Sequence, residues 1–249
     1  FIAWTTTPWT LASNTALCVG PKIDYVCVQT YNPYTGEKIS VVMAEARLSA
    51  YFNPEGATAD MEAYKKGDKI LPYRVVGRWT GSELENMHYE QLFPYVRPYG
   101  EGEPFRVILG DYVSTEDGTG IVHIAPTFGA DDALVAKKAG VPGLQMITKK
   151  GKFAPMVDLQ GRFFRLEDLD EEFVKTHVNV EAYGPYAGRY VKNAYDSTLT
   201  DKDETLDVSI CMDMKQEGKA FNIAKHAHSY PHCWRTDKPV LYYPLDSWF

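Results

Sequence analysis

The chain has 249 residues, of which 45% are hydrophobic and 24% are charged, a composition typical of a soluble globular protein with a substantial core. Its net charge of −7 argues against a protein that holds nucleic acid by overall electrostatic attraction, so any nucleic-acid contact must be local. No run approaches the roughly 18 apolar residues of a membrane helix, and no signal-peptide pattern precedes the first apolar stretch.

The cysteines and the two ends of the chain indicate its setting. Four cysteines are scattered widely, so we expect reduced thiols in a cytoplasmic protein and no disulfide framework. The chain opens on Phe1 inside an apolar stretch and stops at Phe249 without a polar tail. We therefore expect it to be cut from a longer polypeptide.

Short apolar runs separated by turns dominate the chain, with helical patterns between them. The predicted strands cover residues 25–29, 39–43, 73–79, 105–109 and 120–124, the first two forming a hairpin. The predicted helices cover residues 44–51, 131–139 and 203–218, the last with Leu206, Ile210, Cys211 and Met214 on one stripe. This order favours an α+β fold with a β-barrel-like core and surrounding helices.

A hydroxyl-rich segment lies near the N-terminus, where residues 4–14 read Trp-Thr-Thr-Thr-Pro-Trp-Thr-Leu-Ala-Ser-Asn. The β-branched threonines favour extended backbone until Pro8, which favours the first turn of a short helix. Threonine hydroxyls both donate and accept hydrogen bonds, so this cluster suits a ribose, a carbonyl or a water. The alternative is a strand and a helix start whose hydroxyls make only structural hydrogen bonds.

A second segment, residues 118–132, predicts a strand, a short loop and the start of a helix. The loop is short enough to bring Asp131 or Asp132 back beside the strand that carries His123. The helix dipole favours the ionised form of such a carboxylate, which would suit an ammonium group. The alternative is a helix cap at Asp131 and a histidine that belongs to the core.

Two further segments are rich in potential ligands. Residues 225–236 hold His226, His228, His232 and Cys233, but Thr236 stands where a Cys-x-x-Cys zinc motif would have its second cysteine, so we expect no metal. Residues 133–157 contain no acidic residue, and Lys149, Lys150 and Lys152 could supply a local RNA contact. The alternative for these lysines is an ordinary solvated surface.

Together, residues 4–14, 118–132 and 228–249 resemble the editing domain that is inserted into the catalytic domain of isoleucyl-tRNA synthetases. The related leucyl and valyl enzymes typically have Thr-Thr-Arg-Pro at the first segment, so Thr7-Pro8-Trp9 favours the isoleucyl branch. The resemblance implies one editing domain over residues 1–249, as a fragment of a larger synthetase.

The resemblance also implies a reaction and partners. It implies hydrolysis of valine from tRNA(Ile), and in second place of valyl-adenylate, because this family is documented to reject valine by only about two orders of magnitude in its synthetic pocket. The partners would be the 3′ end of the tRNA and the rest of the synthetase. No cofactor is expected here, since ATP and Mg²⁺ would serve the catalytic domain outside this chain.

The resemblance assigns roles to individual residues. Asp132 would hold the α-ammonium of the substrate, and His123 would line its side-chain pocket near the terminal ribose. The residues expected to contact the terminal adenosine, the ester and the attacking water are Thr5, Thr6 and Thr7. The residues expected to help bind the substrate are Trp9, Thr10 and Asn14.

Three other functions are open from the sequence. A valyl-type editing domain would remove threonine, and a non-catalytic module would only bind RNA. A metal hydrolase would use His226, His228 and His232.

Overall fold

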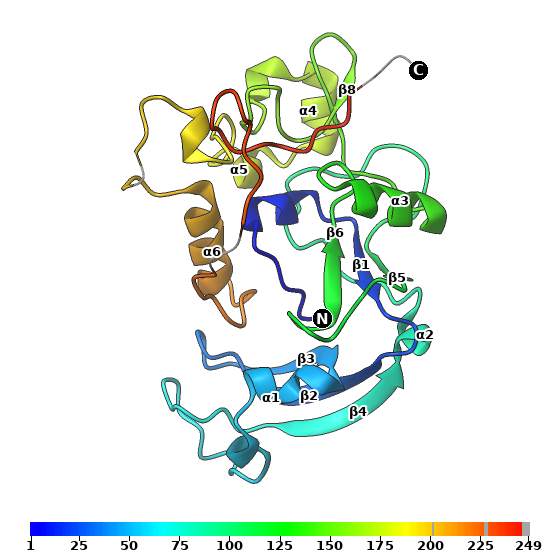
Figure 1. Cartoon of the computed structure of the whole chain (residues 1–249), viewed down its shortest axis with the longest axis vertical. Coiled ribbons are helices and arrows are strands. Elements are labelled where there is room, and N and C mark those ends of the chain that lie inside the picture. The colour runs from blue at the N-terminus through cyan, green and yellow to red at the C-terminus, as the bar shows by residue number, and fades with distance from the viewer. Residues whose placement is uncertain (201, 227–228, 246–249) are drawn as a thin grey trace.

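Two three-stranded sheets form the centre of the molecule (Figure 1). The structure is a computed structural model that describes residues 1–200, 202–226 and 229–245. The strand order is β5-β1-β6 in the first sheet and β3-β2-β4 in the second. The strands are β1 (Ala16–Val19), β2 (Asp24–Tyr31), β3 (Lys38–Ala44), β4 (Arg74–Thr80), β5 (Arg106–Leu109) and β6 (Ile121–Ile124). β1 pairs parallel to β5 and antiparallel to β6.

Backbone hydrogen bonds outside the strands join the two sheets. On one side, the Ile2 N–H donates to the Val42 carbonyl of β3 at 3.0 Å, and Trp4 pairs with Val122 of β6. On the other side, the segment that follows β4 pairs with β5 through hydrogen bonds such as Asn86 N–H to the Val107 carbonyl, at 2.9 Å. The strands thus surround a barrel-like core, and the predicted α+β fold is confirmed.

Apolar side chains from both sheets fill the space between them. This cluster consists of Leu17, Val19, Tyr25, Ala44, Leu84, Val107 and Ile121. The Tyr25 hydroxyl is buried in it, donates to the Gly120 carbonyl at 2.6 Å and accepts from the Gly20 N–H at 2.9 Å. Both hydrogen bonds satisfy this buried polar group, and the one to Gly120 links the turn before β6 to the second sheet.

Helices and a small hairpin make up most of the rest. The α-helices are α1 (Leu48–Tyr51), α2 (Gly81–Leu84), α3 (Ala130–Ala139), α4 (Glu171–His177), α5 (Val180–Tyr183) and α6 (Leu206–Gln216). The 3₁₀ helices are η1 (Pro8–Ser13), η2 (Glu45–Arg47), η3 (Pro54–Ala57), η4 (Leu166–Asp168) and η5 (Asn193–Tyr195). The hairpin joins β7 (Met146–Ile147) to β8 (Phe153–Ala154).

The predicted stripe of α6 faces a core that it shares with η1. Leu206 and Ile210 are buried, at 2% and 0% exposure, in the same cluster as Trp9 and Leu11 of η1. The Thr205 side chain caps the helix by accepting from the Val208 N–H at 3.3 Å. The apolar face of α6 therefore packs directly against η1, the helix within the hydroxyl-rich segment.

The helix predicted over residues 44–51 begins one residue later, and only its second half is α-helical. Ala44 is the last residue of β3, paired with Tyr25, and its N–H donates to the Thr119 carbonyl at 2.9 Å. A 3₁₀ turn and a one-turn α-helix follow. Tertiary hydrogen bonds at Ala44 thus override a local helix preference.

Several elements in the described ranges have no counterpart in the sequence prediction, among them β1, the β7–β8 hairpin and the helices η4, α4 and α5. All four residues of β1 are buried, so the strand shows no apolar–polar alternation. The four cysteines are free thiols, as predicted. No helix in the described part of the chain is long and apolar enough to cross a bilayer.

Candidate functional site

The hydroxyl-rich segment and the His123 segment meet at one end of the first sheet. Ala16, the first residue of β1, pairs with Ile124, the last residue of β6. Since η1 precedes β1 and α3 follows β6, both helices lie at this end (Figure 1). The antiparallel pairing of β1 and β6 therefore brings together side chains 109 and 113 residues apart in the sequence.

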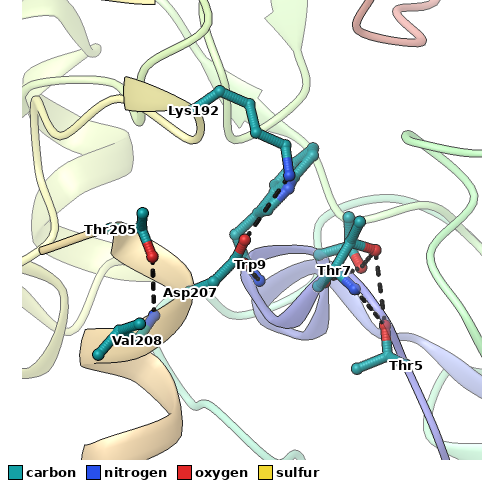
Figure 2. A network of polar contacts seen from close by, with 8 residues as sticks. Thr5, Thr7, Trp9, Lys192, Thr205, Asp207 and Val208 are labelled. Carbon is teal, nitrogen blue, oxygen red and sulfur yellow. Dashed lines mark hydrogen bonds and ion pairs between the residues drawn. The ribbon is translucent and has the colours of Figure 1, made fainter. Parts of the chain in front are cut away.

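The threonine hydroxyls form a connected row along the start of η1 (Figure 2). Thr5 Oγ1 accepts from the Thr7 N–H at 3.1 Å and lies 3.5 Å from Thr7 Oγ1. Thr7 Oγ1 lies 3.4 Å from Thr10 Oγ1. The Thr6 hydroxyl makes no hydrogen bond with the residues that the structure describes, and its side chain is partly exposed. The row therefore offers hydroxyls that can still bond a ligand.

His123 joins this row in one defined tautomer. Thr10 Oγ1 donates to the Thr7 carbonyl at 2.8 Å, so it must accept from His123 Nε2, at 3.1 Å. His123 Nδ1 lies 3.5 Å from Asn14 Nδ2, which can only donate. The network thus assigns the ring proton to Nε2, and the lone pair of Nδ1 faces Asn14.

Burial keeps the His123 ring neutral. Part of the side chain is accessible, but loss of hydration among the surrounding atoms lowers the pKa of His123 from its ordinary 6.5 to about 4. At neutral pH the ring therefore carries no charge. It can orient a hydrogen bond or shape a pocket, but it does not attract an anion.

Tyr89 and Asn14 fix the far side of the histidine. Asn14 is buried, at 5% exposure, and its Nδ2 donates to the Ala16 carbonyl at 2.8 Å. Its Oδ1 accepts from the Tyr89 hydroxyl at 2.6 Å. Tyr89 thereby fixes the amide orientation that selects the His123 tautomer. Sequence reasoning missed Tyr89, because no local pattern links it to a residue 75 positions away.

Asp132 is the carboxylate that returns to the strand end. Its Oδ2 accepts from the Ala125 N–H at 2.8 Å, two residues after His123. No hydrogen bond to Oδ1 is found within the described residues. Burial raises the pKa of Asp132 above its ordinary value, the Ala125 N–H opposes this rise, and the charge of Asp131 adds to it. The helix dipole was expected to favour ionisation, and loss of hydration instead dominates.

The proposed capping role of Asp131 is not found. The N-cap of α3 is Gly129, without a side-chain cap, and Asp131 is exposed in the first turn. A β-carbon on Gly129 would lie 3.0 Å from Cγ of Asp132 and 3.2 Å from its Oδ2. Glycine at the cap therefore leaves room for the Asp132 carboxylate to reach Ala125.

Trp9 supports the site from the core side. Its side chain is 2% exposed and packs edge-on against Phe128, with ring centroids 4.8 Å apart. The backbone N–H of Trp9 donates to Asp207 Oδ1 of α6 at 2.9 Å (Figure 2). The structure thus places Trp9 beneath the hydroxyl row, and Phe128 fixes the loop between His123 and Asp132.

Comparison with known proteins shows which proteins have a similar sequence. The chain is 68% identical to isoleucine–tRNA ligase of Bacteroides fragilis over 249 residues and 62% identical to that of Porphyromonas gingivalis over 250. It is 36% identical to that of Treponema denticola over 258 residues. Each match covers all of this chain. This chain is a homologue of isoleucine–tRNA ligases.

The homology covers only part of those enzymes. The chain spans 22% of the Bacteroides and Porphyromonas ligases and 18% of the Treponema ligase. No protein-family profile matches it. Among solved structures it resembles GlLeuRS-CP1, with a TM-score of 0.48 and 17% identity over 90% of this chain and 83% of that one. The editing domain of the Plasmodium knowlesi cytosolic leucyl-tRNA synthetase gives a TM-score of 0.44 at 14% identity over 87% of this chain and 81% of that one.

The lysines of this ligase homologue lie apart from the hydroxyl row. Lys149, Lys150 and Lys152 are exposed at the tip of the β7–β8 hairpin, at the end of the molecule where α4 lies (Figure 1). A shallow depression beside Lys149 is also lined by Glu171 and Glu172. These carboxylates offset part of the positive charge of Lys149, and the same depression is not lined by Lys150 or Lys152.

The histidine-rich segment is described only in part. His228 lies outside the described residues. His226 stacks edge-on against Trp4, with ring centroids 5.3 Å apart, and His232 Nδ1 lies 2.8 Å from the Tyr230 carbonyl. In the described ranges, no three His, Cys, Asp or Glu side chains are grouped closely enough to hold a metal.

Proposed function

We propose that this chain is an editing domain that hydrolyses the ester of valine misattached to tRNA(Ile). Valyl-adenylate is a second substrate of the same site. The observation that carries the proposal is the meeting, at one end of β6, of a row of hydroxyls, a neutral histidine and a carboxylate with a free oxygen. The homology to isoleucine–tRNA ligases along the whole chain supports this reaction class.

The hydroxyls suit the reacting ester. An aminoacyl ester is already reactive, so positioning a water and stabilising the developing oxyanion are sufficient to accelerate its hydrolysis. The Thr6 hydroxyl makes no hydrogen bond within the described ranges, and the Thr7 hydroxyl lies 3.4 and 3.5 Å from two neighbouring hydroxyls. Both can turn toward the ester or the water. His123 orients this row through Thr10 rather than acting as a base, since its lone pair faces Asn14.

Asp132 suits the amino group of the substrate. Oδ2 is fixed by the Ala125 N–H, so Oδ1 can accept a charge-assisted hydrogen bond from an α-ammonium. The arriving ammonium would lower the raised pKa of this carboxyl and complete its ionisation. An amino acid held there by its ammonium places its ester toward the end of β6.

The tRNA and the rest of the synthetase are the proposed partners. The site accepts the 3′ end, while exposed Lys150 and Lys152 contact phosphates farther along the strand. The chemistry proposed above uses side chains of this chain only. We accordingly propose that hydrolysis needs no metal or other cofactor in this domain.

The test is deacylation of valyl-tRNA(Ile) and isoleucyl-tRNA(Ile) by this chain, with a chelator present. Selective loss of valine is expected, since the synthetic step in this family needs a second selection of this kind. Threonyl-tRNA(Val) separates a valyl-type editing domain from the proposed one. Tight tRNA binding without deacylation of any of these would overturn the proposal in favour of an RNA-binding module. Activity abolished by the chelator would overturn its metal-free chemistry.

A further inference from the structure

The start of η1 lacks the side-chain cap that its sequence would normally provide. Thr7 is the N-cap residue, and a threonine in that position usually accepts from the N–H groups two or three residues later. Here Thr7 makes no such hydrogen bond, and its φ and ψ are −130° and 74°. Pro8 has no backbone N–H, so the first backbone donor of η1 that needs a partner is the Trp9 amide N–H.

Asp207 takes the place of that cap from another element. Its Oδ1 accepts from the Trp9 N–H at 2.9 Å, although the two residues are 198 positions apart (Figure 2). The Thr10 N–H is satisfied by the Thr7 carbonyl at 3.0 Å. Every donor that the Thr7 hydroxyl would otherwise cap therefore has a partner. Thr7 Oγ1 is left facing Thr5 and Thr10.

We propose that Asp207 is a positioning residue that caps η1 in place of Thr7 and so keeps the Thr7 hydroxyl available for the reaction. This inference rests on the proposed function, because it assumes that the Thr7 hydroxyl acts on the ester or on the water. Asp207 itself touches neither. Without it, the Thr7 hydroxyl turns back to the Trp9 N–H and leaves the row.

The surroundings of Asp207 fit a fixed role rather than an incidental contact. Its side chain is only 23% exposed, and its Oδ2 lies 3.6 Å from Nζ of Lys192, which is itself 21% exposed. The packing of α6 on η1 through Leu206 and Trp9 holds the carboxylate at the helix start. Burial raises the pKa of Asp207, and Lys192 and the Trp9 N–H oppose this rise.

The experiment compares Asp207→Ala, Asp207→Asn and the control Asp203→Ala in deacylation of valyl-tRNA. Asp203 lies three residues before α6, and among the described residues its side chain accepts hydrogen bonds only from the exposed Thr200. Its carbonyl accepts from Asn193 Nδ2 at 3.0 Å, a bond that Asp203→Ala keeps. Asp207→Ala should lower kcat by at least about tenfold with little change in KM, because it diverts a hydroxyl aimed at developing charge. Asp207→Asn keeps an acceptor and should restore most of kcat, and Asp203→Ala should match the wild type.

A double-mutant cycle with Thr7→Val separates positioning from simple support of the fold. If Asp207 acts through the Thr7 hydroxyl, Asp207→Ala should change kcat by less than about twofold once that hydroxyl is absent. An equal loss of kcat in both backgrounds overturns the proposal. Thermal unfolding of each variant identifies any that fail to fold. If an Asp207→Ala variant does not fold, Asp207→Asn with and without Thr7→Val replaces it in the cycle.

A readout without catalysis keeps this inference distinct from the proposed function. The Trp9 amide resonance should shift as Asp207 is protonated, and a crystal structure of Asp207→Ala should show Thr7 Oγ1 within hydrogen-bond distance of the Trp9 nitrogen. If the wild type deacylates none of the aminoacyl-tRNAs, the proposed function fails. The Trp9 amide resonance and the Asp207→Ala crystal structure still test whether Asp207 caps η1. A Trp9 amide unaffected by pH and by Asp207→Ala overturns the cap.

Discussion

Replacing Asp132 with asparagine isolates the charge of the proposed ammonium anchor. Asparagine has nearly the same shape, and its side-chain oxygen can still accept from the Ala125 N–H that now bonds Oδ2 at 2.8 Å. The loop between β6 and α3 should therefore keep its conformation. What the substitution removes is the negative charge on the oxygen that faces the substrate.

The expected loss follows from the strength of one charge-assisted hydrogen bond. Such bonds contribute about 1.5 to 3 kcal/mol, and at about 1.4 kcal/mol per tenfold this corresponds to a loss between roughly tenfold and 150-fold. We expect the loss in kcat/KM for valyl-tRNA, since the ammonium is held in both the bound ester and the transition state. The KM should therefore rise more than kcat falls.

The raised pKa of Asp132 sets the sign of two pH effects. Binding of the ammonium should weaken as pH falls through a value above the ordinary 3.8, and Asp132→Asn should lack this acidic limb. The folded state holds the Asp132 proton more tightly than the unfolded state does, so ionisation of this group lowers stability as pH rises through the raised pKa. At neutral pH, Asp132→Asn should therefore unfold at the same temperature as the wild type or at a higher one.

Single-turnover deacylation of valyl-tRNA with thermal unfolding of the same samples measures both effects. Asp131→Asn is the matched control, because Asp131 is exposed one residue away and does not cap α3. It should alter deacylation by less than about twofold, as surface substitutions away from a site usually do. A larger loss of deacylation in Asp131→Asn than in Asp132→Asn, or normal deacylation by Asp132→Asn, would show that Asp132 does not hold the ammonium.

Three further changes test the rest of the site. Thr7→Val keeps the branched shape but removes a hydroxyl, so the rate of deacylation should fall by about two to three orders of magnitude. A wild-type rate would show that the Thr7 hydroxyl has only a structural role. His123→Ala should lose valine hydrolysis or begin to hydrolyse isoleucyl-tRNA, because one methylene contributes about 1 to 3 kcal/mol to the discrimination between the two amino acids. Unchanged selectivity would show that His123 has only a structural role. The His123 pKa of about 4 also predicts that the deacylation rate of the wild type shows no inflection from this residue near pH 6.5. Replacing Lys149, Lys150 and Lys152 with glutamine should flatten the dependence of log affinity on log salt by somewhat under one unit for each true phosphate contact, and an unchanged slope would place the RNA path elsewhere.

Elements with a local signal in the sequence could be predicted without the structure. The apolar stripe of Leu206 and Ile210 predicted α6, and Gly140, with φ of +70°, ends α3 where the sequence predicted. Pro8 starts a short helix after the threonines, as its fixed φ and missing N–H favour. In each case the periodicity, the cap or the breaker lies within the element itself, so no distant contact is needed to read it.

The contacts of the candidate residues, in contrast, follow from the three-dimensional packing. It placed Asp132 rather than Asp131 at the strand end, because the Asp132 carboxylate accepts from the Ala125 N–H and glycine at position 129 leaves room for it. The tautomer of His123 depends on an amide held by Tyr89, and the cap of η1 comes from Asp207. The His123 tautomer and the η1 cap depend on single hydrogen bonds between residues 75 to 198 positions apart. Such bonds leave no periodicity in the sequence, and the packing of β1 on β6 and of α6 on η1 creates them.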